Sequence, residues 1–303
     1  MRVSKPLIRT LVVAFVVFDV ALGVLAWRHV TAGESTPAST GVTVGGPTDN
    51  PGNFIPNPGT SEGTDNFQTQ DPATATMVDA SSEVLIVATT GACDGTAPTV
   101  LVSEDGGQNL APVKPDVSRV LAVDVLTDGT LEIVGADDDC EAIGLTSDDG
   151  GATWDTDSIG TDWYRDPESP TGLVVANTPT DVGCQVVSVS DVSASVARVS
   201  CDDGTVRATD DAGKSWTTAG GLTAVRALSF RSNASGVALV QTDDCAVTAF
   251  LTVDGGDTWE QRGCADGQVA RAVLDQDDRI LASVDATVSE STDGGLTWKP
   301  PAG

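Results

Sequence analysis

Short segments of alternating apolar and polar residues recur from about residue 74 to the end of the chain. Residues 119–125 (RVLAVDV), 130–136 (TLEIVGA) and 142–147 (AIGLTS) show the pattern most clearly, and Asp128-Gly129 separates the first two. Such alternation predicts β-strands with one face in a core, and an Asp-Gly pair between two strands predicts a hairpin. Because almost no part of this region has helical spacing, the pattern predicts an all-β domain.

A turn motif recurs between these segments, with the form Ser/Thr-x-Asp-x-Gly-x-Ser/Thr-Trp; we name it the repeat turn. Its four full copies are Ser147, Asp149, Gly151, Thr153 and Trp154; Thr209, Asp211, Gly213, Ser215 and Trp216; Thr252, Asp254, Gly256, Thr258 and Trp259; and Ser291, Asp293, Gly295, Thr297 and Trp298. A weaker copy has Ser103, Asp105 and Gly107, followed by Asn109 and Leu110 in place of the Thr-Trp pair.

The residue types of the repeat turn predict a structural role. The Asp can accept hydrogen bonds from backbone N–H groups, the hydroxyl can bond across the mouth of the turn, and Gly can adopt positive φ. The Trp is large and apolar with a single N–H, which suits burial between neighbouring hairpins.

The repeat turn resembles the Asp-box, or bacterial neuraminidase repeat, and the resemblance covers about residues 74–303. Asp-boxes occur in sialidase-like β-propellers and in the propellers that assist photosystem II assembly. The resemblance implies a β-propeller in which the boxes stabilise turns and lie away from the ligand face. It does not by itself identify a function.

Successive repeat-turn aspartates are separated by 44, 62, 43 and 39 residues. About 40 residues suffice for one propeller blade of four short antiparallel strands, with the repeat turn joining the third strand to the fourth. Five units predict five blades; six are possible if residues 158–180 contain further strands. Otherwise the long gap is an insertion of roughly 20 residues, around SIGTDWYRDPESPTG, on the face opposite the repeat turns.

The chain before the propeller has three predicted parts. Residues 1–6 are a cytoplasmic end, residues 7–27 are an apolar transmembrane signal anchor preceded by Arg2 and Lys5, and residues 28–73 are a disordered linker rich in Gly, Pro, Ser and Thr. A cleaved signal peptide is the alternative, because residues 30–32 (VTA) resemble a cleavage site. The propeller, residues 74–303, would then lie outside the cytoplasm, anchored in the cell membrane or secreted.

Six cysteines lie in the region predicted to be exported, which favours disulfides. Strand register pairs Cys245 with Cys264 and Cys184 with Cys201, and Cys93 and Cys140 remain, both near turns of adjacent units.

Charge and composition exclude several chemistries. The net charge of −28 argues against a nucleic-acid partner. The only histidine, His29, precedes the propeller, so Ser-His-Asp triads and histidine-ligated metals are excluded there. No cofactor is expected. The acidic turns at residues 137–139, 202–203 and 243–244 are interpreted as solvated turns, with a weak calcium site as the alternative.

Three arginines open equivalent predicted strands: Arg119, Arg226 and Arg271. They are expected to surround one mouth of the central channel, on the face away from the repeat turns, where they could bind a carboxylate or an acidic peptide. This arrangement resembles the carboxylate clamp of sialidases and the arginine-bearing face of the assembly-factor propellers. The alternative is that each arginine pairs with a nearby Asp.

Trp163, Tyr164 and Arg165 form a second candidate site in the predicted insertion. Aromatic residues beside an arginine are typical binding anchors, although they could equally hold the loop to the domain.

The function expected is a non-catalytic binding or assembly module at the cell envelope, with a protein or an anionic glycan bound on the face opposite the repeat turns. A sialidase-like exo-glycosidase is the alternative. It would need a Tyr nucleophile with a supporting Glu, for which only Tyr164 and Glu168 are available, and the Arg-Ile-Pro signature of that family is absent.

Overall fold

The computed structural model describes residue 71, residues 74–276 and residues 279–302. All of them belong to one compact unit of the chain, Asn53–Gly303. The predicted cytoplasmic end, the membrane segment and nearly all of the predicted linker lie outside the described residues. None of the described segments is a helix with the length and apolar character needed to cross a membrane.

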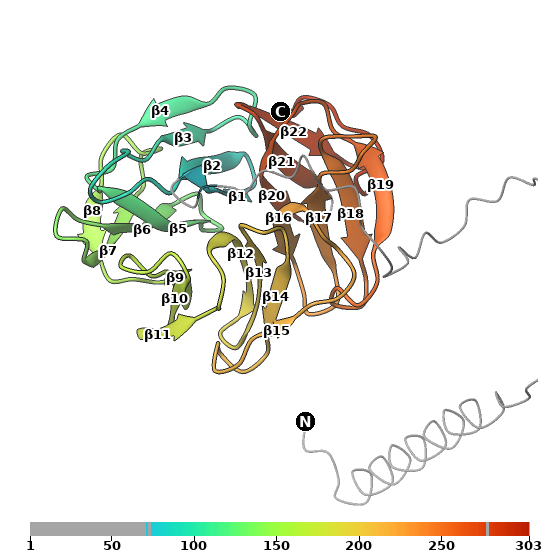
Figure 1. Ribbon diagram of the computed structural model, residues 1–303. Coiled ribbons are helices and arrows are strands. Elements are labelled where there is room, and N and C mark those ends of the chain that lie inside the picture. The colour runs from blue at the N-terminus through green and yellow to red at the C-terminus, as the bar shows by residue number, and fades with distance from the viewer. Residues whose placement is uncertain (1–70, 72–73, 277–278, 303) are drawn as a thin grey trace, which may run out of the picture. The chain divides into compact units, whose positions relative to one another are not determined.

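The described residues form six antiparallel sheets arranged around a centre, which makes the domain a six-bladed β-propeller (Figure 1). Blades 1 and 2 each have four strands: β1 (Thr76–Ser81), β2 (Val84–Thr89), β3 (Val100–Ser103) and β4 (Ala111–Val113), then β5 (Arg119–Val125), β6 (Leu131–Ala136), β7 (Ala142–Ser147) and β8 (Asp155–Asp157). Blade 3 has three strands: β9 (Trp163–Arg165), β10 (Gly172–Val175) and β11 (Thr178–Asp181).

The remaining blades follow the same order along the chain. Blade 4 contains β12 (Val186–Ser193), β13 (Val196–Cys201), β14 (Val206–Thr209) and β15 (Thr217–Thr218). Blade 5 contains β16 (Val225–Phe230), β17 (Gly236–Val240), β18 (Thr248–Thr252) and β19 (Glu260–Cys264), and blade 6 contains β20 (Ala270–Asp275), β21 (Ile280–Val284) and β22 (Thr287–Ser291). An isolated bridge from Glu290 to Lys299 takes the place of a fourth strand in blade 6.

The all-β propeller is confirmed, but the expected count of five blades is wrong and the alternative of six is correct. The supposed insertion at residues 158–180 contains the strands of blade 3. Its two outer strands are joined by Ala176 and Asn177, both at positive φ, so they form a two-residue hairpin turn. Because blade 3 has no repeat turn, a blade count based on the repeat turns omits it.

One apolar cluster lies at each junction between neighbouring blades. The described core divides into six clusters, and each combines residues of two adjacent blades. The junction of blades 6 and 1 is typical, with Leu281 and Val288 packed against Leu85 and Val87. Since each blade covers the apolar face of the next, burial of these faces requires a closed ring.

Two side chains of blade 6 reinforce the closure of the ring onto blade 1. Gln276 donates a hydrogen bond to the carbonyl of Ala80 at 2.7 Å, and Arg279 donates to the carbonyl of Ser82 at 2.8 Å. Among the strands that the structure describes, none is exchanged between the first and last blades, so side-chain packing and these two bonds connect them.

Each repeat turn is closed by the bonds that its residue types predict. In the turn of blade 5, the Thr252 hydroxyl donates to Asp254 at 2.8 Å and accepts from the N–H of Gly256 at 2.9 Å. Asp254 also accepts the backbone N–H and the hydroxyl of Thr258, at 2.9 and 2.6 Å. The carboxylate therefore joins both sides of the turn.

The weaker copy in blade 1 closes in the same way with different chemistry. Asn109 donates its backbone N–H to Asp105 at 2.9 Å and its side-chain amide at 2.6 Å, where the other copies use a hydroxyl residue. Leu110 takes the place of the Trp and packs at the junction of blades 6 and 1. The departure from the motif thus preserves both functions of the turn.

These hydrogen bonds stabilise the ionised form of the turn aspartates. Bonds from Thr258 and Thr252 lower the pKa of Asp254 to about 2, and bonds from Thr297 and Ser291 do the same for Asp293. A lowered pKa means that the stabilisation is complete above the ordinary value of 3.8 and is lost as the pH falls through about 2.

The tryptophans of the full copies are half-buried at the junctions. Trp154, Trp216, Trp259 and Trp298 each pack against the cluster of a different junction. Trp259 also meets Phe230 edge to face, with ring centroids 5.8 Å apart. The prediction that these rings lie between neighbouring hairpins is confirmed.

The three predicted disulfides are all present. Cys93–Cys140 connects blade 1 to blade 2, Cys184–Cys201 lies beside the first hairpin of blade 4, and Cys245–Cys264 lies within blade 5. The described residues include no free cysteine. Each bond restricts the unfolded chain, which typically stabilises the folded state by about 2–4 kcal/mol.

The repeat turn of blade 4 contains a strained alanine. Ala212 has a φ of 59°, at a position where the other copies have Gly106, Gly150, Gly255 and Gly294, all with positive φ. We expect Ala212→Gly to stabilise the protein by about 0.5–1 kcal/mol, because relief of the left-handed strain exceeds the entropy that glycine loses on folding. Urea unfolding measures the change.

Ala152, an exposed alanine in the repeat turn of blade 2, is the matched control. It directly follows Gly150 and Gly151 of the same turn and is not at positive φ, so Ala152→Gly should leave stability unchanged or lower it. Equal effects of the two substitutions would show that Ala212 is not strained.

Candidate functional site

The innermost strands of the six blades enclose a central channel of about 390 Å³. Its wall consists of β1, β5, β9, β12, β16 and β20. The propeller has two faces, one at each end of these strands. We name them the repeat-turn face, which carries the repeat turns, and the loop face, which carries the opposite connections and the three disulfides.

The two ends of the channel differ in charge. Asp79, Asp124, Asp191 and Asp275 line it near the ends of their strands, towards the repeat-turn face. Arg231 is the cation among them, 3.8 Å from Asp275. At the loop-face end, Arg165 is the arginine among the described residues that line the channel. Arg119, Arg226 and Arg271 lie at the loop-face ends of their strands, outside this lining.

Strand register corrects the expected equivalence of the three arginines. Four innermost strands contain a β-bulge near their loop-face ends, and Arg226 and Arg271 occupy the bulged position of β16 and β20. In β5 the bulged residue is Leu121, and Arg119 lies two residues earlier. Only Arg226 and Arg271 are therefore equivalent, because a bulge shifts the count of residues along a strand.

Arg226 and Arg271 lie close enough to affect one another. Burial, and secondarily the positive charge of Arg271, lower the pKa of Arg226. Arg226 is buried and donates to the side-chain oxygen of Gln241 at 2.8 Å. Arg271 is partly exposed and has no hydrogen bond or ion pair within the described part of the chain. The two arginines thus occupy equivalent bulges of neighbouring innermost strands on the loop face.

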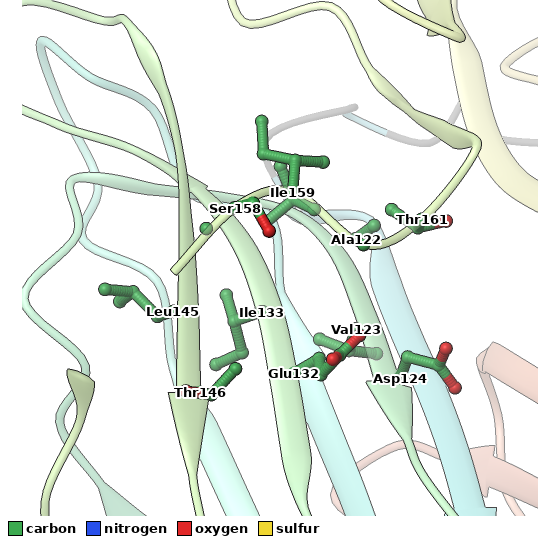
Figure 2. Close-up of a pocket in the computed structure, with 13 residues that line it drawn as sticks. Ala122, Val123, Asp124, Glu132, Ile133, Leu145, Thr146, Ser158, Ile159 and Thr161 are labelled. Carbon is green, nitrogen blue, oxygen red and sulfur yellow. The ribbon is translucent and has the colours of Figure 1, made fainter. Parts of the chain in front are cut away.

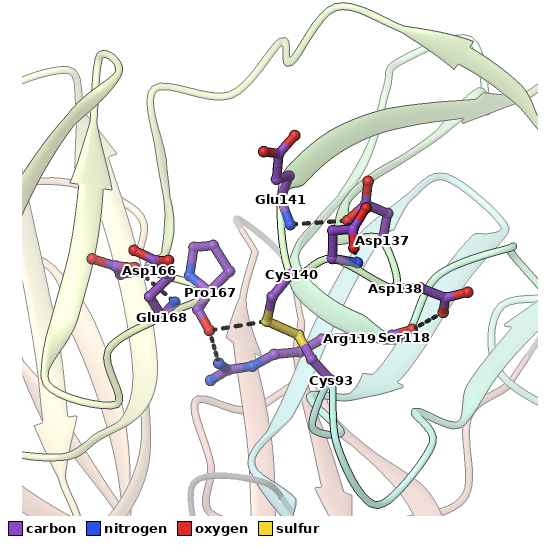
Figure 3. Close-up of a disulfide and its surroundings, with 11 residues drawn as sticks. Cys93, Ser118, Arg119, Asp137, Asp138, Cys140, Glu141, Asp166, Pro167 and Glu168 are labelled. Carbon is purple, nitrogen blue, oxygen red and sulfur yellow. Dashed lines mark hydrogen bonds between the residues drawn. A yellow bond between two sulfur atoms is a disulfide. The ribbon is translucent and has the colours of Figure 1, made fainter.

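Arg119 is held in a different way, at the junction of blades 2 and 3. It donates to the carbonyl of Pro167 at 2.7 Å, in the turn that connects β9 to β10 (Figure 3). Burial lowers the pKa of Arg119, and the charge of Asp166 opposes that effect. Its guanidinium therefore stabilises the contact between two blades through a backbone carbonyl, and not through the ion pair with a nearby Asp that was the alternative interpretation.

Figure 3 shows the surroundings of this contact. The Cys140 sulfur lies 3.5 Å from the same Pro167 oxygen, so the disulfide of blades 1 and 2 touches the turn of blade 3. Ser118 donates to Asp138 at 2.6 Å nearby. Three blades thus meet at one point of the loop face.

Trp163, Tyr164 and Arg165 do not belong to an exposed loop, so that prediction is wrong. They form β9, and the exposed fractions of the three residues are 2, 7 and 3%. Trp163 packs against Trp216 with ring centroids 6.2 Å apart, and Tyr164 packs against Leu121. The interpretation that these residues hold their segment to the domain is the one that the geometry supports.

Arg165 is the most buried cation of the described domain. Its guanidinium donates to the carbonyl of Val186 at 2.6 Å and to that of Val187, both in β12 of the next blade. Burial, together with the nearby charge of Arg119, lowers the pKa of Arg165 to about 9. Because Arg165 bonds to two backbone carbonyls of the next blade and not to a carboxylate, its contact connects blade 3 to blade 4.

The bonds of β9 also establish its direction. Arg165, at the end of β9, contacts the beginning of β12, whereas the indole of Trp163 donates to Ser193 at the end of β12, at 2.8 Å. The two strands therefore run in opposite directions. In contrast, Ser188 and Ser190 of β12 bond to Leu228 and Phe230 of β16 in parallel order.

The reversal of β9 follows from the path of residues 158–161. This segment crosses the face of blade 2, past Leu145 and Ile133, and reaches the channel at Thr161 (Figure 2). The small cavity beneath it measures about 20 Å³, roughly one water molecule. Asp162, just before β9, accepts the N–H of Ala176 in the β10–β11 turn at 3.0 Å, so β9 begins at the repeat-turn end and runs towards the loop face.

The residues proposed for a glycosidase are not arranged as a catalytic pair. Tyr164 is buried, and burial followed by the charge of Asp166 raises the pKa of its hydroxyl. Glu168 is exposed in the turn after β9, and the described residues include no hydrogen bond between the two side chains. A phenol that is harder to ionise is a poorer nucleophile.

In the acidic turns, Asp carboxylates accept hydrogen bonds from backbone N–H groups of the same turn. Asp137 accepts the N–H groups of Asp139 and Glu141, and Asp203 accepts that of Thr205. Within the described residues no group of three or more His, Cys, Asp or Glu is placed to hold a metal ion. These turns therefore give no support to the calcium alternative.

Comparison with known proteins gives similarity in structure only. No protein-family model and no curated protein matches the chain. A structure described as YCF48 bound to D1 peptide is 19% identical, with 75% of this chain and 67% of that chain covered and a TM-score of 0.30. YCF48 from Cyanidioschyzon merolae is 15% identical over 78% and 70%, with a TM-score of 0.30.

A GH74 xyloglucanase from Xanthomonas campestris is 19% identical over 76% of this chain and 38% of the enzyme, with a TM-score of 0.32. Identities and TM-scores this low transfer no ligand and no activity. The assignment of this chain as a β-propeller rests on its own six sheets and six interblade clusters.

Proposed function

We propose that this propeller is a non-catalytic binding module that uses its loop face to hold an anionic group of a protein partner. The observation that carries the proposal is the pair Arg226 and Arg271, two neighbouring guanidinium groups at equivalent bulges. Two adjacent guanidinium groups suit a carboxylate, which can accept from both. The YCF48 structure holds a D1 peptide, but the low similarity leaves the proposal to rest on the arginines.

The charge of the rest of the protein favours selectivity at this site. With a net charge of −28, the wider surface repels polyanions. An anionic group that is presented by a partner of fitting shape can approach the arginines without bringing a large negative charge near the acidic surface. A carboxylate of a protein segment meets this condition better than a nucleic acid, and an anionic glycan is the alternative ligand.

The test uses peptides selected by display against the purified propeller. Selected peptides should be rich in Asp or Glu or end in a free carboxylate, and Arg271→Glu should weaken their binding at least about tenfold, as loss of one charged contact of roughly 1.4 kcal/mol implies. Arg271 is partly exposed, so its reversal should leave the melting temperature nearly unchanged.

Lys214→Glu is the matched control, because Lys214 is exposed in a repeat turn and its reversal alters the net charge equally. It should leave the affinity unchanged. Equal weakening by both variants would show a general charge effect, and full binding by folded Arg271→Glu would place the site elsewhere. The double variant Arg226→Glu/Arg271→Glu also reverses the charge of the buried Arg226. If only this variant unfolds, Arg226 has a structural role.

We further propose that the propeller works outside the cytoplasm, at the cell membrane or in secreted form. Three disulfides support an oxidising compartment, and the apolar sequence at residues 7–27 supports export. Protease added to intact cells should degrade the propeller if the proposal holds. Degradation only after the cells are lysed would contradict it.

A further inference from the structure

Two carboxyl groups meet where blade 1 joins blade 2, at the acidic end of the channel. Asp79 lies on β1 and Asp124 on β5, and both line the channel. The Asp79 carboxyl accepts the backbone N–H of Val125 at 2.7 Å, which places it beside Asp124, the residue before Val125, and the two carboxyl groups interact. The two groups therefore bridge two blades directly.

This bridge requires a proton. An ionised carboxylate can only accept hydrogen bonds, so two carboxylates cannot bond to each other unless one of them carries a proton. When both are ionised, like charges at hydrogen-bond distance repel. The contact between Asp79 and Asp124 is thus formed by a carboxyl and a carboxylate that share one proton.

The surrounding groups favour retention of that proton. Asp191 of β12 and Asp275 of β20 face the same channel, and Glu132 of β6 is close enough to interact with Asp124. Arg231 is the cation on this part of the wall and lies 3.8 Å from Asp275. The neighbouring strand β2 (VLIVAT) has no titratable side chain, and Glu83 lies in the turn before it. Arg119 and Arg271 lie at the loop-face ends of β5 and β20, at the opposite end of these strands from the carboxyl pair.

The opposite end of the same junction is closed by contacts that do not depend on protonation. There Cys93 is bonded to Cys140, and the N–H of Val120 donates to the carbonyl of Thr90 at 2.8 Å. The loop-face end is therefore fixed, and any change in the carboxyl pair acts on the repeat-turn end.

We propose that Asp79 and Asp124 form a proton-dependent latch between blades 1 and 2, which loosens the repeat-turn end of the junction when the shared proton is lost. Burial, followed by the hydrogen bond and the charge of Asp124, raises the pKa of Asp79 from its ordinary 3.8 to about 8. Because the pKa is raised, the stabilisation is complete below about pH 4 and decreases as the pH rises to about 8. Above that pH no further loss is expected.

Hydrogen exchange of the Val125 amide reports on the latch, because this N–H is bonded to Asp79. After correction for intrinsic exchange, protection in the unaltered protein should fall at least about tenfold between pH 6 and pH 8 and then level off. Asp79→Asn keeps a side-chain donor for Asp124 and removes the titration of residue 79. In this variant, protection of the Val125 amide should therefore change less than about twofold over the same pH range.

Asp116→Asn is the matched control, because Asp116 is exposed before β5 and lies outside the junction. It should behave as the unaltered protein does. Equal pH dependence in the unaltered protein and in Asp79→Asn would overturn the proposal. Should Asp79→Asn not fold, carboxyl-carbon NMR of the unaltered protein decides: titration of both Asp79 and Asp124 near pH 4 overturns the latch, and one titration near pH 8 supports it.

Discussion

The buried guanidinium of Arg165 bonds the irregular third blade to the fourth. It donates to two carbonyls at the beginning of β12, and the Trp163 indole of the same strand donates to Ser193 at the end of β12. Blade 3 lacks a repeat turn and consists of three short strands, so its own sheet contributes little. The desolvation of Arg165 lowers its pKa to about 9, which still leaves the side chain charged at neutral pH. Together with the bond from Arg119 to Pro167 and the apolar clusters on both sides, this contact connects blade 3 to its two neighbours.

The arrangement of charge follows from the direction of the innermost strands. Five of them begin at the loop face and end at the repeat-turn face, with Arg226 and Arg271 near two beginnings and Asp124 and Asp275 near two ends. The reversed β9 adds Arg165 to the basic end because it finishes there. Several arginines of a strongly acidic protein therefore lie at the loop-face ends of the innermost strands. The repeat-turn face consists of tight turns whose aspartates are already bonded to their own backbone.

Much of this architecture could be predicted from the sequence, because its signals are local. Strands such as β5, β16 and β20 follow from alternation, the repeat turns follow from a fixed spacing of hydrogen-bonding residues, and the disulfides follow from strand register. Blade 3 could not be counted, since it lacks the motif; its signal was the apolar run at residues 172–175 followed by Ala176 and Asn177. The bulges that separate Arg119 from Arg226 and Arg271, and the meeting of Asp79 with Asp124, depend on packing between blades and leave no trace in local sequence.

Native-state hydrogen exchange of β10 tests the central structural claim most directly. This strand lies in the middle of blade 3, between β9 and β11, so its amides are bonded on both sides. A six-bladed ring predicts that the amides of residues 172–175 are protected to a degree comparable with those of β17, the second strand of blade 5. Exchange as fast as that of an unstructured peptide would contradict the account. Residues 158–180 would then be an insertion in a propeller of five blades.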